Sequence, residues 1–160
     1  MKAVRFDRYG GPEVLEVREV EDPVAVPGEV VVAVEAAGIN PGEIAIREGH
    51  LHERFPASFP SGEGTDLVGI VAIVGDGVSG FTVGDEVLGW SERRSSHAEL
   101  VLVPESQLVA KPAELSWEVA GSLFVASMAA WASVEAVGVT EGDVVAVSAA
   151  ARSRSACPSP

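Results

Sequence analysis

The strongest constraint on the fold is a series of short, apolar, β-branched runs that Gly and Pro divide. The two longest are "EVVVAVEAAGIN" at Glu29–Asn40 and "DLVGIVAIVG" at Asp66–Gly75, and shorter ones are "AVRF", "DEVLGW" and "HAELVLVP". "EVLEVREV" at Glu13–Val20 alternates apolar and charged residues, which is the period of a half-buried strand. Strands at this spacing predict a mainly β fold with few helices, either a sandwich or a partly open barrel.

The composition changes near Lys111-Pro112. The stretch "LSWEVAGSLFVASMAAWASVEAVG" is rich in Ala, Ser and Val and predicts a helix over Ser116–Val137 that ends at Gly138. "EGDVVAVSAAA" then predicts a buried strand at Val144–Ala149, and a helix followed by such a strand is how a parallel α/β sheet begins. The large side chains of the helix are three or four residues apart and share one face: Trp117, Ala120, Phe124, Met128 and Trp131.

One short helix is predicted inside the β-rich part. In "PGEIAIREG" at Pro41–Gly49, Pro stands early and Gly stands at the C-terminal end, as in many helices. Glu43 and Arg47 are four residues apart, so they could pair on one helix face, and we expect such a pair to be structural.

Composition and charge exclude several classes of function. The formal net charge of -13 argues against nucleic acid or an anionic membrane as a partner, because phosphates would be repelled. The single cysteine, Cys157, excludes an internal disulfide and a multi-cysteine zinc site. No apolar run has the length of a membrane span, and the N-terminus lacks the apolar core of a signal peptide, so we expect a cytoplasmic protein.

Three patterns look like functional motifs but have simpler interpretations. The glycines of "GDGVSG" at Gly75–Gly80 match a dinucleotide fingerprint, but a strand-like run follows where a helix is required, so we predict a β-turn. His50 and His52 could form a ligand pair on a strand, although a loop with two solvated histidines is the simpler interpretation. The adjacent residues "SSH" at 95–97 do not make the geometry of a catalytic triad.

Taken together, the motifs resemble one family. The chain is similar to the N-terminal part of a zinc-independent medium-chain dehydrogenase/reductase of the quinone-oxidoreductase type, from Met1 to about Ala151. The matching stretches, in order, are "GINPGEIAIREG", "DLVGIVAIVGDGVSGFTVGDEVLGW", "HAELVLVPESQLVAKPAELSWEVAGSL" and "GDVVAVSAAA". The resemblance implies a GroES-like β domain, a following Rossmann domain that binds NADPH, and hydride transfer to a quinone or an α,β-unsaturated carbonyl.

The resemblance also implies candidate site residues and no metal. Zinc-dependent relatives carry a Cys after the Gly-x-Asn region and a Gly-His-Glu in the next block, whereas here Pro41 follows Asn40 and "GEGTD" contains no His. Asn40 aligns with an Asn near the nicotinamide, although an Asn-Pro turn without a ligand is the alternative. The expected substrate-side residues are Ile46 and Trp90. The expected cofactor-side positions are Met128 and Ala129, of which Ala129 replaces a Thr that reaches the cofactor phosphates in the family.

We expect three segments: a GroES-like domain at residues 1–112, the start of a Rossmann domain at 113–151, and an aberrant tail at 152–160. In the tail, Arg and Ser stand where the family has glycines that approach phosphate, and two prolines oppose a helix. Our hypothesis is that the tail results from a reading-frame error, and the alternative is a natural or cloned C-terminus.

Two functional hypotheses follow. The first is that this chain is the N-terminal part of an NADPH-dependent oxidoreductase, inactive on its own. The second is a non-catalytic GroES-like module that binds or supports a partner. In either case the helix and strand after Pro112 would leave apolar side chains such as Phe124, Met128 and Val145 uncovered, so we expect self-association or disorder there.

Overall fold

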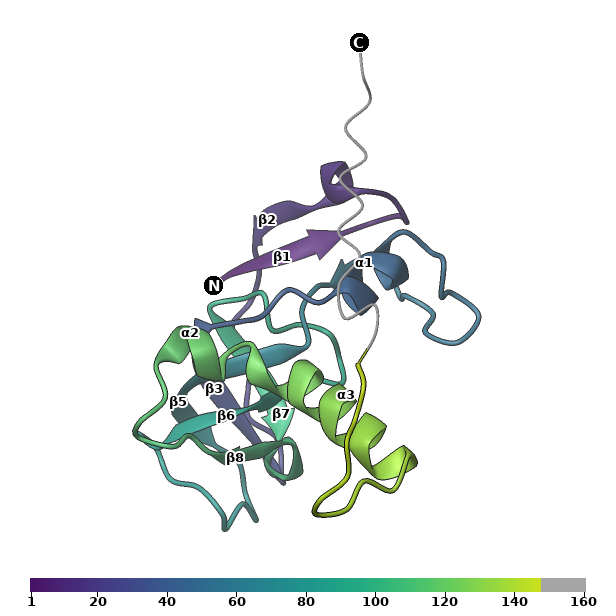
Figure 1. The fold of residues 1–160 in the computed structure, drawn as a ribbon. Helices are drawn as coiled ribbons and strands as arrows, with labels where there is room; N and C mark the ends of the chain where they lie inside the picture. Colours follow the sequence, from purple (N-terminus) through teal and green to yellow (C-terminus); the bar gives the residue numbers. More distant parts are fainter. Residues whose placement is uncertain (148–160) are drawn as a thin grey trace.

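Two open antiparallel sheets make up most of the computed structural model, which describes residues 1–147 (Figure 1). One sheet has the strand order β2-β1-β4 and the other the order β7-β3-β5-β6-β8. The mainly β fold class is therefore confirmed, and neither sheet closes into a barrel. The strands are β1 (Lys2–Phe6), β2 (Glu16–Glu19), β3 (Glu29–Ala36), β4 (Ser61–Gly62), β5 (Asp66–Val74), β6 (Glu86–Trp90), β7 (Leu100–Pro104) and β8 (Leu108–Ala110).

The core lies on the five-stranded sheet, where β5 is the central strand and β3 and β6 flank it. The β-branched runs of the sequence supply it: Val30 and Val32 of β3 and Leu67 of β5 are 0% exposed. Each such side chain stabilises the fold by about 1.5–3 kcal/mol relative to exposure. The rest of this cluster is Val71, Val87, Val101, Val103 and Leu108.

Gly69 allows β3 and β5 to approach closely. A Cβ at this position would lie 2.0 Å from the carbonyl oxygen of Ala33 on β3, far inside van der Waals contact. The register of β3 and β5 pairs these two strands along almost their full length, from Val30↔Val74 to Ala36↔Val68. A side chain at Gly69 would therefore force these two strands apart.

The predicted short helix is present as α1 (Pro41–Arg47). Asn40 is its N-cap, and Gly49 follows its end with a φ of 81°, a left-handed conformation that favours glycine. The other regular turns are two 3-10 helices, η1 (Pro12–Val14) and η2 (Glu105–Gln107). The first of these replaces the start of the strand predicted at Glu13–Val20, because Pro12 favours a helical turn.

The long helix predicted at Ser116–Val137 is two helices, α2 (Trp117–Ala120) and α3 (Leu123–Ala136), so this prediction was wrong in its continuity. The Ser116 hydroxyl caps α2, as expected, by accepting from the Val119 N–H at 3.4 Å. The break occurs at Gly121, which is buried so closely against β3 that a Cβ would lie 2.9 Å from Ala36. Packing against the sheet therefore redirects the chain there.

The predicted strand at Val144–Ala149 is not present in the part that the structure describes. Val144–Val147 form no strand, and Val144 and Val147 are 99% and 79% exposed. The physical reason is that strand geometry needs a hydrogen-bonded neighbour, and residues 1–147 offer none at this place. Ser148–Ala149 and the predicted tail at 152–160 lie outside the described residues.

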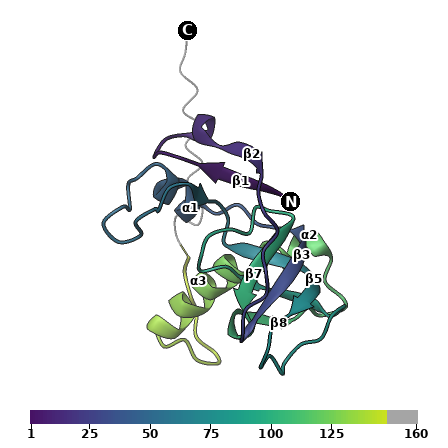
Figure 2. The same ribbon diagram turned by 180° about the vertical axis from the view of Figure 1, so that it is seen from behind.

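The arrangement places α1 between the two sheets. Figures 1 and 2 show the small sheet of β1 and β2 on one side of α1 and the five-stranded sheet on the other, with α3 beside the larger sheet. The short helix α2 covers a second cluster on that sheet, formed by Val68, Leu88 and Ala120. No helix among residues 1–147 is long and apolar enough to cross a membrane.

Candidate functional site

A cavity of about 400 Å³ lies where α1, the loop after it, the start of β5 and the end of β6 meet. Both predicted substrate-side residues, Ile46 and Trp90, are on its wall. Sequence reasoning did not single out the remaining lining residues, which come from a loop without regular periodicity and from strand ends: Arg54, Phe55, Pro56, Thr65, Ser91, Glu92 and Arg94. The assignment of Ile46 and Trp90 to a substrate stays a prediction, but they share one cavity.

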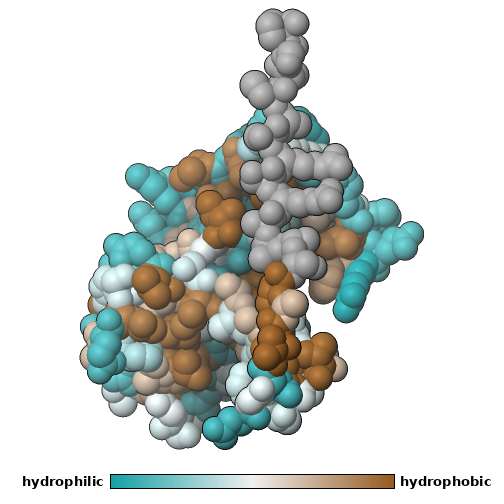
Figure 3. Space-filling view, in the orientation of Figure 1, coloured by the Kyte–Doolittle hydropathy of each residue, from teal (hydrophilic) through white to brown (hydrophobic). Residues whose placement is uncertain are grey.

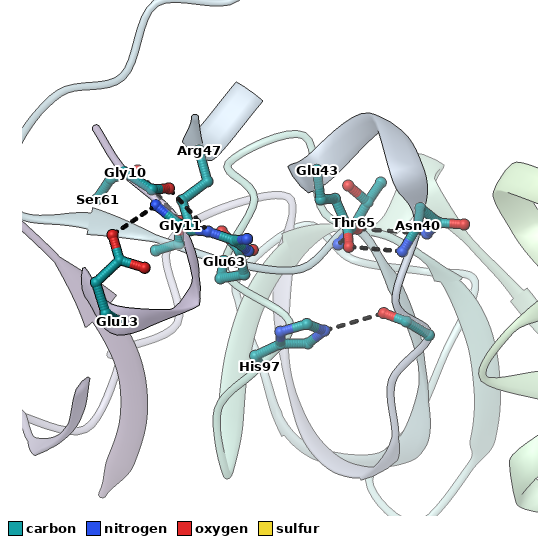
Figure 4. A network of polar contacts seen from close by, with 12 residues as sticks. Gly10, Gly11, Glu13, Asn40, Glu43, Arg47, Ser61, Glu63, Thr65 and His97 are labelled. Carbon is teal, nitrogen blue, oxygen red and sulfur yellow. Dashed lines mark hydrogen bonds and ion pairs between the residues drawn. The ribbon is translucent and has the colours of Figure 1, made fainter. Parts of the chain in front are cut away.

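Asn40 and Thr65 are joined by one carboxylate beside this cavity (Figure 4). Glu43 is 5% exposed, and its Oε1 accepts from the Thr65 backbone N–H at 2.6 Å and from the Asn40 Nδ2 at 3.3 Å. Its Oε2 accepts from the Asn40 backbone N–H at 3.0 Å. Glu43 therefore ties the start of α1 to the start of β5 and fixes which way the Asn40 amide is turned.

Asp66 connects the β-rich part to α3. Its side chain is 0% exposed, and Oδ1 accepts from the Val125 N–H at 3.1 Å, in the first turn of α3. A carboxylate at a helix N-terminus is favourable because it faces the positive end of the helix dipole. Burial nevertheless raises the pKa of Asp66, which the Val125 bond only partly offsets, and among residues 1–147 Oδ2 has no hydrogen-bond partner.

A stacked aromatic pair holds the same junction from the cavity side. The ring of Trp90, at the end of β6, stacks on that of Phe124 in α3 with centroids 5.3 Å apart and an angle of 3° between the planes. Trp90 thus touches α3 with one part of its surface and the cavity with another. The position of α3 and the shape of the cavity are therefore linked through one side chain.

The two predicted cofactor-side positions lie apart from this cavity. Met128 is 50% exposed on α3, Ala129 is exposed next to it, and neither lines the cavity. Of the predicted apolar face, Ala120 is buried, but Met128 and Trp131 are exposed, the latter at 63%. The predicted apolar face therefore packs against the core only at its N-terminal end.

Arg47 does not pair with Glu43, so that expectation was wrong. Arg47 donates from Nη1 to Glu63 Oε1 at 2.5 Å, and both side chains are 7% exposed. Burial raises the pKa of Glu63, and the Arg47 guanidinium acts in the opposite direction. The pair lines a second cavity of about 450 Å³, whose other walls come from α1, β1 and β2.

The glycine pattern and the histidines lie in turns and loops of the structure. Asp76 and Gly77 form the turn between β5 and β6, and β6, not a helix, is the next element, which confirms the β-turn. His50 and His52 are exposed in a turn, and His97 lies within 2.9 Å of the Gly38 carbonyl oxygen through Nε2. Residues 1–147 contain no cluster of three or more His, Cys, Asp and Glu side chains that could hold a metal.

The donor set beside the cavity fits one end of NADPH. The Asn40 amide and the Thr65 hydroxyl can donate and accept, as the carboxamide and ribose groups require. Met128 and Ala129 offer no polar side-chain hydrogen to phosphate. The fit is therefore limited to the nicotinamide end, for the residues that the structure describes.

Comparisons with known proteins show the family of this chain. The family profile "Alcohol dehydrogenase GroES-like domain" matches residues 26–113. Quinone oxidoreductase of Mus musculus is 37% identical over 124 residues, which are 77% of this chain and 37% of that protein. Quinone oxidoreductase of Homo sapiens is 32% identical over 149 residues, which are 92% of this chain and 45% of that protein. The chain thus spans less than half the length of these curated relatives.

Solved structures of quinone oxidoreductases are similar to this chain as well. Quinone oxidoreductase from Coxiella burnetii superimposes with a TM-score of 0.81 and 30% identity, covering 89% of this chain and 47% of that chain. Quinone oxidoreductase of Escherichia coli complexed with NADPH superimposes with a TM-score of 0.79 and 28% identity, covering 86% of this chain and 41% of that chain.

Proposed function

Because this chain belongs to the medium-chain dehydrogenase/reductase family through its alcohol dehydrogenase GroES-like domain, we propose that it forms the substrate-side wall of an NADPH-dependent reductase of quinones or α,β-unsaturated carbonyls. The observation that carries the proposal is the cavity that joins Ile46, Trp90 and Thr65 next to Asn40. Aromatic and aliphatic walls suit a planar conjugated substrate, and the few polar groups suit orientation.

In this proposal each residue has a limited task. NADPH supplies the hydride when it is bound. Glu43 holds the Asn40 amide in one orientation, so that Asn40 can bind the nicotinamide end. Trp90 and Ile46 exclude water from the substrate and hold its plane, and orientation of this kind can contribute about 7–11 kcal/mol to lowering a barrier.

The experiment compares two proteins. Residues 1–160 alone should not oxidise NADPH measurably with quinones or enones, because the proposed site holds only one end of the cofactor. A chimera that joins residues 1–147 to the C-terminal part of Mus musculus quinone oxidoreductase should do so. Clear turnover by the 160-residue chain, free of host reductase, would contradict the incomplete-site account.

Variants of the chimera test the residues. Asn40→Ala should lower turnover, and Asn40→Ser separates the two tasks of Asn40, because Ser still caps α1 but lacks the amide. A folded chimera that binds NADPH but shows no reductase activity would instead favour the non-catalytic binding module.

A further inference from the structure

The cavity carries a local positive charge in an acidic protein. Two arginines, Arg54 and Arg94, and one acid, Glu92, line it, whereas the chain as a whole has a formal net charge of -13. The Glu92 carboxylate also accepts from Gln107 Nε2 at 3.4 Å, outside the cavity lining. The charged side chains of the lining therefore carry an excess of one positive charge, in a chain whose formal net charge is negative.

The Arg94 guanidinium makes hydrogen bonds that stabilise the fold. Its guanidinium donates to the carbonyl oxygens of Pro56 at 2.8 Å and Phe55 at 3.5 Å, which fastens the loop after α1 across the cavity. Its backbone has a φ of 52°, in the left-handed region, and its carbonyl lies so close to Gly62 that a Cβ there would be 2.6 Å away. The hydrogen bonds of Arg94 thus hold the loop and position Phe55 and the neighbouring Arg54.

The Arg54 guanidinium makes no such hydrogen bonds among residues 1–147. Its guanidinium lies over the Phe55 ring, 5.3 Å from the centroid, and among residues 1–147 no ion pair or hydrogen bond of this group is found. Stacking on the ring limits where the charge can move, while the N–H groups stay available to an acceptor. Arg54 therefore presents a cation at the wall of a cavity whose other walls are largely apolar.

We propose that Arg54 determines specificity at this site and that the preferred substrates are planar quinones or enones that carry a carboxylate or a similar oxyanion. The inference rests on the proposed function, since it assigns the same cavity to the substrate. The ring of such a compound packs between Ile46, Phe55 and Trp90, and its anionic group accepts charge-assisted hydrogen bonds from Arg54.

The test measures binding to the 160-residue chain and does not depend on turnover. The probes are benzylideneacetone with a para carboxylate and the same enone with a para carboxamide, which have nearly equal size. Dissociation constants come from NMR titrations that follow the indole N–H of Trp90. We expect the carboxylate to bind about tenfold more tightly at low salt, and the ratio to fall as ionic strength rises.

Two variants decide the outcome. Arg54→Gln should bring the ratio of the two dissociation constants close to one, and Lys2→Gln, which removes a positive charge on β1 outside the cavity, should leave the ratio unchanged. Equal binding of the two probes by the parent protein, or a preference that persists in Arg54→Gln, would overturn this inference alone. Failure of both probes to shift Trp90 would overturn the proposed function and this inference with it.

Discussion

The strands of the five-stranded sheet and the helix α3 are both rich in apolar residues, yet only the strands bury them. Val30, Val31 and Val32 of β3 are 0% exposed, whereas α3 has no buried residue among its fourteen. Figure 3 shows hydrophobic surface over α2 and the strands beneath it, and again over the segment after α3. α3 also lacks a polar face, which is typical of helices that are covered on all sides. The β-rich part therefore has its own core, whereas the apolar residues of α3 remain partly or fully exposed among the described residues.

The largest effect is expected from breaking the buried ion pair beneath the small sheet. Arg47→Met leaves the Glu63 carboxylate buried without its cation, so the free energy of unfolding should fall by about 3–5 kcal/mol. Urea titration followed by circular dichroism measures the loss. The double variant Arg47→Met/Glu63→Leu removes both charges and should recover most of it. If the single variant is as stable as the parent, the β-rich part does not depend on this pair.

The next effect compares equivalent truncations in the two regions. Leu67→Ala on β5 removes a fully buried side chain and should cost about 2–5 kcal/mol, because it leaves a cavity in the core. Val134→Ala on α3 removes a side chain that is 47% exposed and should cost less than about 0.5 kcal/mol. Thermal and urea unfolding of both variants provide the measurement. Equal losses would show that α3 belongs to the same cooperative core.

The sequence correctly predicted the strands and the helix that depend on signals within a few neighbouring residues. The β-branched runs predicted the strands of the larger sheet, and Pro41 with Gly49 predicted α1, since these signals act over a few residues. The resemblance suggested Ile46 and Trp90, which the structure places on one cavity. In contrast, Arg47 pairs with Glu63, which is sixteen residues away in the sequence, and no short-range pattern predicts this ion pair.

Other features depend on neighbours that a pattern does not contain. Arg54 and Phe55 lie in a loop without periodicity, so no local signal assigned them to a cavity wall. The strand predicted at Val144–Ala149 failed within the described residues because a strand is completed by its partner strand, not by its own composition.

A smaller, pH-dependent effect is expected at the junction between the two regions. Burial raises the pKa of Asp66 above its ordinary value, so the folded state binds a proton more readily than the unfolded state. The stabilising contribution of the protonated carboxyl is complete below the unfolded pKa and is lost as pH rises through the folded pKa. Asp66→Asn removes this titration but keeps an oxygen that can accept from the Val125 N–H.

The stability of Asp66→Asn relative to the parent should therefore increase as pH rises from about 4 to about 7. Urea titrations across this range measure the difference. Glu114→Gln, which removes an exposed carboxylate just before α2, serves as the control for a general loss of charge. A constant difference between Asp66→Asn and the parent across the range would show that Asp66 is ionised equally in both states.

The smallest effect on the free energy of unfolding is expected from a substitution that tests self-association of the chain. It is also the most direct test of the difference between α3 and the β-rich part. We propose that the uncovered surface of α3 causes the chain to self-associate, since Trp131 in its C-terminal half is 63% exposed and its C-cap, Val137, is 71% exposed. Trp131→Lys should leave the free energy of unfolding within about 0.5 kcal/mol but should shift the protein toward monomer in sedimentation velocity runs. Val17→Lys is the matched control, because Val17 is 70% exposed on β2, in the region that has its own core. If the surface of α3 is responsible, only the Trp131 variant dissociates. A parent protein that is monomeric at high concentration, or equal dissociation by both variants, would show that exposure on α3 has no special role.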